Sequence, residues 1–160
     1  MQAHVDPMRL RYFRSRLRHW FRAHGRDLPW RRTCDPYRIL LSEIMLQQTQ
    51  VSRVAQVYEQ FLAAYPRIED VAAAPLRDIR RITDPLGHKV RGRQIKRIAD
   101  EVVRHRAGRV PDTMPGLLEL PGVGRYTAGA VMTFAHGRPT PIVDTNVDRV
   151  LGRWFAGVFP

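Results

Sequence analysis

The sequence has a single cysteine, few acidic side chains and no long apolar run. Cys34 is its only cysteine, so the chain cannot close an internal disulfide, fill a structural zinc site or hold an iron–sulfur cluster. Its longest apolar runs, such as Ala128–Met132, are far too short to span a bilayer. The basic N-terminus lacks the continuous apolar stretch of a secretory signal. We therefore expect no membrane partner, no metal, no cofactor in this chain and a cytoplasmic location.

Basic side chains are abundant and are mostly arginine. The 160 residues include 27 Lys and Arg against 15 Asp and Glu, a formal net charge of +12. Arginine is suited to bidentate contacts with phosphate, so this excess favours a nucleic-acid partner. A GC-rich genome that encodes arginine in place of lysine would give the same composition, and charge alone does not decide between the two explanations.

Apolar residues recur at helical spacing along almost the whole sequence, and the alternation typical of strands is absent. Gly25 predicts the end of a first helix, and Asp35-Pro36 predicts the start of a second, with an N-cap followed by proline. The pattern predicts an all-α protein of eight or nine mostly short helices. Their expected ranges are about 7–24, 36–46, 51–65, 68–73, 75–83, 91–106, 114–119, 125–135 and 145–155.

A glycine-rich turn separates two of these helices. Gly122 and Gly124 flank Val123, so the backbone can turn sharply and approach another molecule closely while Val123 packs inward. The free N–H groups of the following helix favour an anion such as a DNA phosphate. With Leu-Pro before the turn and small residues after it, the segment at about 114–135 resembles a helix-hairpin-helix motif, although an ordinary αα-corner can contain the same Gly-x-Gly.

Two carboxylates are candidates for a chemical role, because their expected surroundings would keep one protonated and the other ionised. Glu43 lies in an apolar helix, where burial would raise its pKa and keep it protonated. The alternative is a paired or surface glutamate. Asp144 precedes the last helix, where it could be a simple N-cap, and the helix N-terminus would also keep it ionised.

Three separated motifs resemble the endonuclease III and MutY superfamily of DNA glycosylases. They are the hairpin Leu120–Ala128, the aspartate loop Thr140–Val150 and the run Ser42–Val51, which is most similar to the MutY adenine glycosylases. The resemblance implies an all-α HhH-GPD DNA glycosylase fold. It also implies that Glu43 protonates the leaving base and that Asp144 stabilises the sugar cation.

The same resemblance assigns further site residues. Gln48 and Thr49 correspond to the loop that probes the opened base pair. Trp30 and Arg31 correspond to the entry of the base pocket, although a tryptophan is more often a core residue. Tyr126 and Asn146 match positions beside the sugar.

Tyr126 stands where the bifunctional lyases of the family carry lysine. Since tyrosine cannot form a Schiff base, we expect a monofunctional enzyme that leaves the DNA backbone intact.

The sequence departs from the family pattern in two places. His88 replaces the tyrosine that wedges into the base stack; it could stack in its stead or simply face solvent. The family continues into further helices and an iron–sulfur cluster, so we expect the carboxy-terminal part of the fold to be missing here. Residues 1–28 would then be a helix of the second lobe, 29–144 the helical domain with the hairpin, and 145–160 the aspartate helix that begins the truncated lobe. The apolar face of helix 7–24 would be left partly exposed, as a liability or a dimer contact.

The sequence therefore predicts a monomeric, nucleoid-associated repair enzyme acting on double-stranded DNA with a mismatch or damaged base. Adenine opposite 8-oxoguanine or G is the first expected substrate. A thymine or uracil mismatch glycosylase on the same fold is the alternative, and a non-catalytic DNA-binding hairpin module is a third hypothesis.

Overall fold

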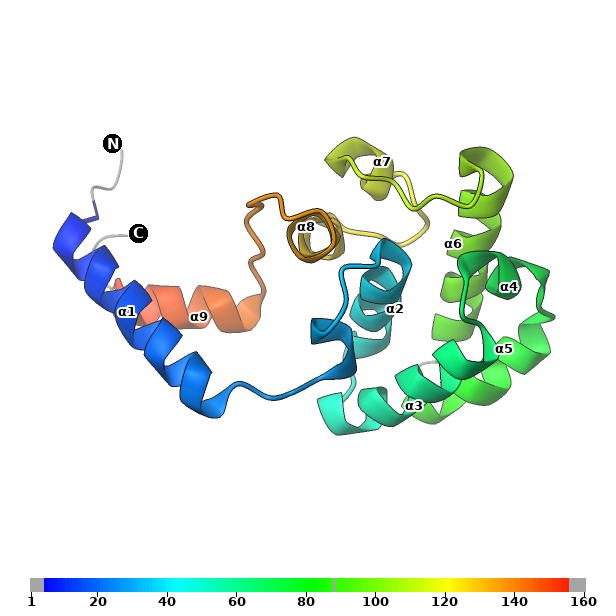
Figure 1. The fold of residues 1–160 in the computed structure, drawn as a ribbon, viewed down its shortest axis with the longest axis horizontal. Coiled ribbons are helices and arrows are strands. Elements are labelled where there is room, and N and C mark those ends of the chain that lie inside the picture. The colour runs from blue at the N-terminus through cyan, green and yellow to red at the C-terminus, as the bar shows by residue number, and fades with distance from the viewer. Residues whose placement is uncertain (1–4, 88, 156–160) are drawn as a thin grey trace. The chain divides into compact units, whose positions relative to one another are not determined.

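A computed structural model describes residues 5–87 and 89–155. In these ranges the chain forms nine α-helices and two short 3₁₀ segments, with no strand, which confirms the all-α prediction (Figure 1). The chain divides into two compact units, residues 28–142 and residues 1–27 with 143–160, each with its own packing. No helix in the described part has the length and apolar character that a bilayer crossing requires.

Helix α2 (Pro36–Leu46) is the central element of the unit 28–142. It packs against α3 (Val51–Ala64), α6 (Arg91–Arg106) and α8 (Arg125–Phe134), and in Figure 1 it lies between α8 and α6. Asp35 caps it by accepting a hydrogen bond from the Arg38 backbone N–H at 3.1 Å. Because helices surround α2, nearly all of its residues from Tyr37 onward are buried.

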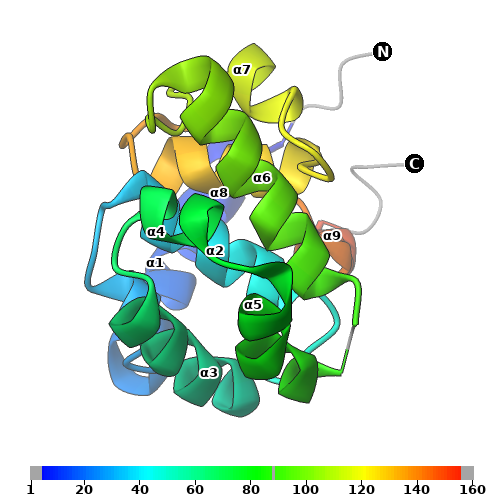
Figure 2. The same cartoon turned by 90° about the vertical axis from the view of Figure 1, so that its right-hand side faces the viewer.

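The other elements of this unit complete the core around α6. Helices α4 (Ile68–Ala73) and α5 (Leu76–Thr83) pack beside α6 (Figure 2). The 3₁₀ segment η2 (Asp84–Leu86) follows α5 directly and contacts it. The segment η1 (Pro29–Arg31) precedes α2, and α7 (Met114–Leu118) packs on α8. Fully buried core side chains include Val54, Phe61, Ile79, Val102 and Leu117.

The second unit pairs α1 (Pro7–His24) with α9 (Thr145–Trp154). The Phe13 ring lies 5.2 Å from the Trp154 ring and 5.4 Å from the Phe155 ring, centroid to centroid. The Arg9 guanidinium donates a hydrogen bond to the Trp154 carbonyl oxygen. None of the residues of α1 is fully buried, so the apolar side of this helix is partly exposed, as the sequence suggested.

Candidate active site

Glu43 lies in the middle of α2 and is only 8 % exposed. Its carboxyl group makes no hydrogen bond or ion pair with any described residue, and the neighbouring Ser42 hydroxyl donates instead to the Ile39 carbonyl oxygen at 2.8 Å. Burial raises the pKa of Glu43 to about 7, because water no longer solvates the anion. A substantial fraction of Glu43 is therefore protonated at neutral pH, as a general acid requires.

The loop after α2 carries Gln48 and Thr49. Gln48 has a φ of +55°, in the left-handed region that few side chains adopt. The Thr49 hydroxyl donates to the Leu86 carbonyl oxygen at 3.2 Å, which ties this loop to η2. Gln48 is therefore exposed at a bend in the backbone, and the next residue, Thr49, is held in place by its hydrogen bond to Leu86.

Arg91, at the start of α6, also holds this loop. It was not identified from the sequence. It is 2 % exposed, and its guanidinium donates to the Ile44 carbonyl oxygen at 3.1 Å, the Leu86 carbonyl oxygen at 3.3 Å and the Thr49 hydroxyl at 2.9 Å. It also donates to the Gln47 carbonyl oxygen. A signal was available, since Arg91 precedes Ile95 by four residues and so shares the apolar face of α6.

The glycine-rich turn joins α7 to α8. Gly122 has a φ of +72°, a conformation that favours glycine, and buried Val123 donates its N–H to the Leu120 carbonyl oxygen at 3.1 Å. Gly124 is the N-cap of α8, and a Cβ placed on it would meet no atom within 4 Å. The first N–H groups of α8 are thus next to an open surface that a phosphate could approach.

Gln94 supports this turn from α6, a role that the sequence did not indicate. Its Nε2 donates to the Gly122 carbonyl oxygen at 3.1 Å. On α8 itself, Tyr126 is 42 % exposed, whereas Thr127 and Gly129 are buried. The side chain of Tyr126 is therefore accessible to solvent near the turn.

Asp144 is the N-cap of α9 and belongs to the other unit. Its Oδ1 accepts hydrogen bonds from the backbone N–H groups of Val147 at 2.7 Å and Asn146 at 3.0 Å. The Asn146 amide donates to Asp144 Oδ2 at 3.2 Å and accepts from Arg149 at 2.9 Å. The Val147 N–H, followed by the Asn146 side chain, lowers the pKa of Asp144, so the carboxylate is ionised at neutral pH.

The expected base-pocket residues differ in exposure. Trp30 is 9 % exposed and lies edge-on to Tyr58, with ring centroids 5.4 Å apart, so its indole is part of the core. Arg31 is exposed at the end of η1. His88 lies outside the described residues. A base-contacting role for these three side chains stays a prediction.

The residues present do not suit an iron–sulfur cluster. Such a cluster is held by four thiolates, and the whole sequence contains one cysteine, Cys34, which is exposed. Within the described ranges, no three His, Cys, Asp or Glu side chains lie together as a metal site would require.

The all-α fold and the hairpin between α7 and α8 define a helix-hairpin-helix protein. The sequence model of the HhH-GPD superfamily base excision DNA repair proteins matches residues 41–157, and the chain belongs to this family, as the motifs predicted.

Similar proteins include two kinds of DNA glycosylase. The adenine DNA glycosylase of Homo sapiens is 40 % identical over 157 residues, which cover 92 % of this chain and 29 % of that protein. The thymine/uracil-DNA glycosylase of Methanothermobacter thermautotrophicus is 38 % identical, with 92 % of this chain and 67 % of that protein covered. The chain thus spans about a third of the first relative and two thirds of the second.

Solved structures of similar fold agree with this assignment. The structure of a thermostable thymine-DNA glycosylase superimposes with a TM-score of 0.89 at 37 % identity, covering 94 % of this chain and 70 % of that one. A non-covalent endonuclease III–DNA complex superimposes with a TM-score of 0.81 at 26 % identity, covering 97 % and 74 %.

Proposed function

We propose that this chain carries the catalytic residues of a monofunctional DNA N-glycosylase, which removes a mispaired base by hydrolysis. The observation that carries the proposal is Glu43, a buried carboxyl group with no partner among the described residues and a pKa of about 7. An unpaired acid is costly in a helix core, so a chemical role explains it better than a structural one.

In the proposed reaction, the bond between the sugar C1′ and the base nitrogen breaks, and its electron pair leaves with the base. Glu43 donates its proton to the departing base. A water molecule supplies the hydroxyl group to C1′, and the proton that it releases restores the acid.

Asp144 is proposed as the anion beside the sugar cation. Its lowered pKa keeps it charged throughout the reaction, and the N–H groups of Val147 and Asn146 fix its orientation. A fixed carboxylate stabilises the positive charge that develops at C1′ without having to reorganise.

The hairpin is proposed to hold double-stranded DNA by its phosphates without reading the sequence, through Gly122, Val123, Gly124 and the N-terminus of α8. Tyr126 in place of a lysine supports base release without strand cleavage, since a phenol cannot form a Schiff base. We expect a monomer that acts at the nucleoid on DNA with a mismatch or damaged base.

Adenine opposite 8-oxoguanine or G is the first proposed substrate, on the likeness of the run Ser42–Val51 to the adenine glycosylases. Thymine or uracil opposite G is the second candidate. The relative from Methanothermobacter thermautotrophicus favours this candidate. The chain covers 67 % of that protein, against 29 % of the human adenine DNA glycosylase.

A single assay tests both candidates. Purified chain is incubated with duplexes carrying A opposite 8-oxoguanine, A opposite G, T opposite G or U opposite G. We expect base release to appear as an alkali-labile abasic site in one class of duplex, and borohydride to trap no covalent adduct. Glu43→Gln is the control variant, and should lower the rate by at least ~100-fold. Duplex binding without release from any of the four would reject the glycosylase and favour a DNA-binding module.

A further inference from the structure

Helix α1 is basic throughout. Over Pro7–His24 it carries six arginines and two histidines, and the helix contains no Asp or Glu. The N-cap residue Asp6 accepts a hydrogen bond from the Met8 backbone N–H at 3.0 Å. The positive charges of α1 thus have no acidic neighbours on their own helix.

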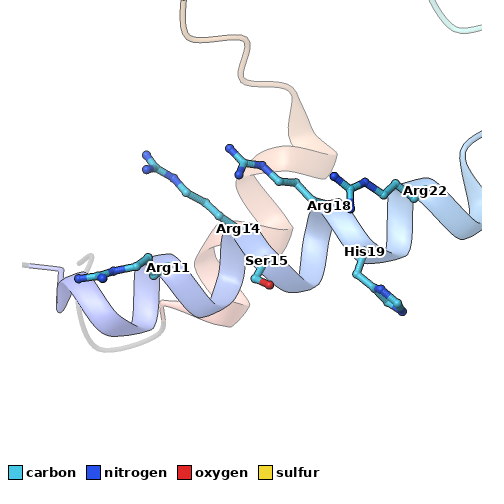
Figure 3. A pocket seen from close by; sticks show the side chains of 6 residues that line it. All are labelled: Arg11, Arg14, Ser15, Arg18, His19 and Arg22. Atoms are coloured by element: carbon cyan, nitrogen blue, oxygen red, sulfur yellow. The ribbon is translucent and has the colours of Figure 1, made fainter.

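Four of these arginines share one face of α1. Arg11, Arg14, Arg18 and Arg22 follow one another at spacings of three or four residues, which places them in a row about 16 Å long. We name this row the arginine face. Together with Ser15 and His19, it lines a hollow on the surface of the helix (Figure 3). The Arg14 and Arg18 side chains extend toward the same side in that view.

Some arginines elsewhere in the described chain form ion pairs with carboxylates. On α5, Arg77 and Arg81 lie 3.7 Å and 3.8 Å from the carboxylate of Asp78. None of the four side chains of the arginine face has an ion pair with a described carboxylate. Four arginines in one row, on a helix without any acidic side chain, concentrate positive charge on one surface, which an anionic partner would complement.

We propose that the arginine face binds the phosphodiester backbone of DNA, as a second phosphate-binding surface besides the hairpin. The proposal rests on DNA being the substrate in the proposed function. Guanidinium groups match phosphate oxygens with two parallel hydrogen bonds, and an extended row suits a polymer of phosphates better than one isolated anion.

A lipid surface is the competing partner for a basic amphipathic helix. Insertion into a bilayer would need the apolar side of α1 to be free. Phe13 on that side packs against Trp154 and Phe155 of the α9 segment, with ring centroids 5.2 Å and 5.4 Å away. Part of the apolar side is therefore already used within the protein, which favours DNA.

Salt dependence of binding to a fully paired duplex tests the proposal. A variant of the full chain replaces Arg11, Arg14, Arg18 and Arg22 by Gln. The control variant replaces four exposed arginines of α5 and α6 by Gln, namely Arg77, Arg81, Arg97 and Arg104. Affinity is measured by fluorescence anisotropy over a salt series, with a thermal melt of each protein.

Each phosphate contact contributes about 0.9 to the slope of log affinity against log salt, so loss of four contacts would lower the slope by up to about 3.6. We expect a larger fall for the arginine-face variant than for the control, and recovery of the slope when Lys replaces the four arginines. A fall no larger than the control's, or no recovery with Lys, would overturn the proposal.

Vesicles of phosphatidylcholine and phosphatidylserine provide the last arm. If the Gln variant loses vesicle binding while its DNA slope equals the control's, the face is a membrane surface and the proposal fails. Because the duplex carries no mismatch, this result is independent of base release. Absence of base release from the mismatched duplexes would reject the glycosylase and leave the slope comparison standing.

Discussion

The guanidinium of Arg91 donates a hydrogen bond to the Thr49 hydroxyl at 2.9 Å, across 42 residues of sequence. The Thr49 hydroxyl in turn donates a hydrogen bond to the Leu86 carbonyl oxygen, and Arg91 donates to the same oxygen at 3.3 Å. One buried side chain thus fixes the loop that bears Gln48, which is five residues beyond Glu43 in the sequence. The positions of the proposed acid and of the proposed probing loop therefore depend on the same arginine.

Replacing Arg91 by Met should destabilise the fold strongly. The change removes the donors of several carbonyl oxygens, and each buried acceptor left unsatisfied costs about 1–3 kcal/mol. We expect a loss of roughly 3 kcal/mol or more in the free energy of unfolding from urea titration. Arg97→Met, an exposed change on the same helix, should stay within about 0.5 kcal/mol. Equal losses in the two variants would show that the network around Arg91 contributes little.

The two hairpin glycines should respond differently to Ala. Gly122 has a φ of +72°, and a Cβ there would lie 2.8 Å from Gln94 Nε2, so Gly122→Ala should lower the melting temperature. Gly124 has a φ of −93° and free space around it, so Gly124→Ala should fold normally. Its methyl group would nevertheless occupy the surface that a phosphate approaches. We expect Gly124→Ala to weaken binding to matched and mismatched duplexes alike. Weakening confined to mismatched DNA would mean that the hairpin reads the lesion.

The fold was largely predictable because its signals are local. Asp35-Pro36 starts α2 where the cap and proline indicated, and Gly25 follows the last residue of α1. The burial of Glu43 followed from its position in an apolar stretch, since a helix apolar on nearly every side must be surrounded. Each of these inferences needs only a few consecutive residues.

The side chains that hold the site together were harder to predict, because their partners are distant in sequence. Arg91 reaches back to Ile44, and Gln94 reaches forward 28 residues to Gly122. Trp30 shows the same limit, since the choice between a core residue and a base-stacking platform depends on its contact with Tyr58. Periodicity places a residue on a face, but it does not say which carbonyl oxygen that face will meet.

The raised pKa of Glu43 should make stability depend on pH. The carboxyl has a pKa of about 7 in the folded chain against 4.5 for an unperturbed glutamate, so the folded state binds more protons between these values. Stability should therefore fall as pH rises from 4.5 to 7, by about 3 kcal/mol for a shift of this size. Glu43→Gln removes this titration. The variant should gain stability over the parent chain at pH 8, and little at pH 4.5, in urea titrations. An equal difference at both pH values would contradict the burial of an ionisable acid.

The last prediction separates the two roles of Asp144, the cap and the anion. Asn at this position keeps a side-chain oxygen for the N–H groups of Asn146 and Val147, so the cap survives and stability should change by less than about 0.5 kcal/mol. Ala removes the cap, at a cost of about 1 kcal/mol. Both variants lack the charge, and loss of one preorganised electrostatic group typically lowers a rate by on the order of 100-fold. We therefore expect similar, large losses in the single-turnover rate of base release for Asp144→Asn and Asp144→Ala, despite their different melting temperatures. If the rate follows stability instead, normal in Asn and reduced in Ala, then Asp144 acts as a cap and the anion beside the sugar must be another group.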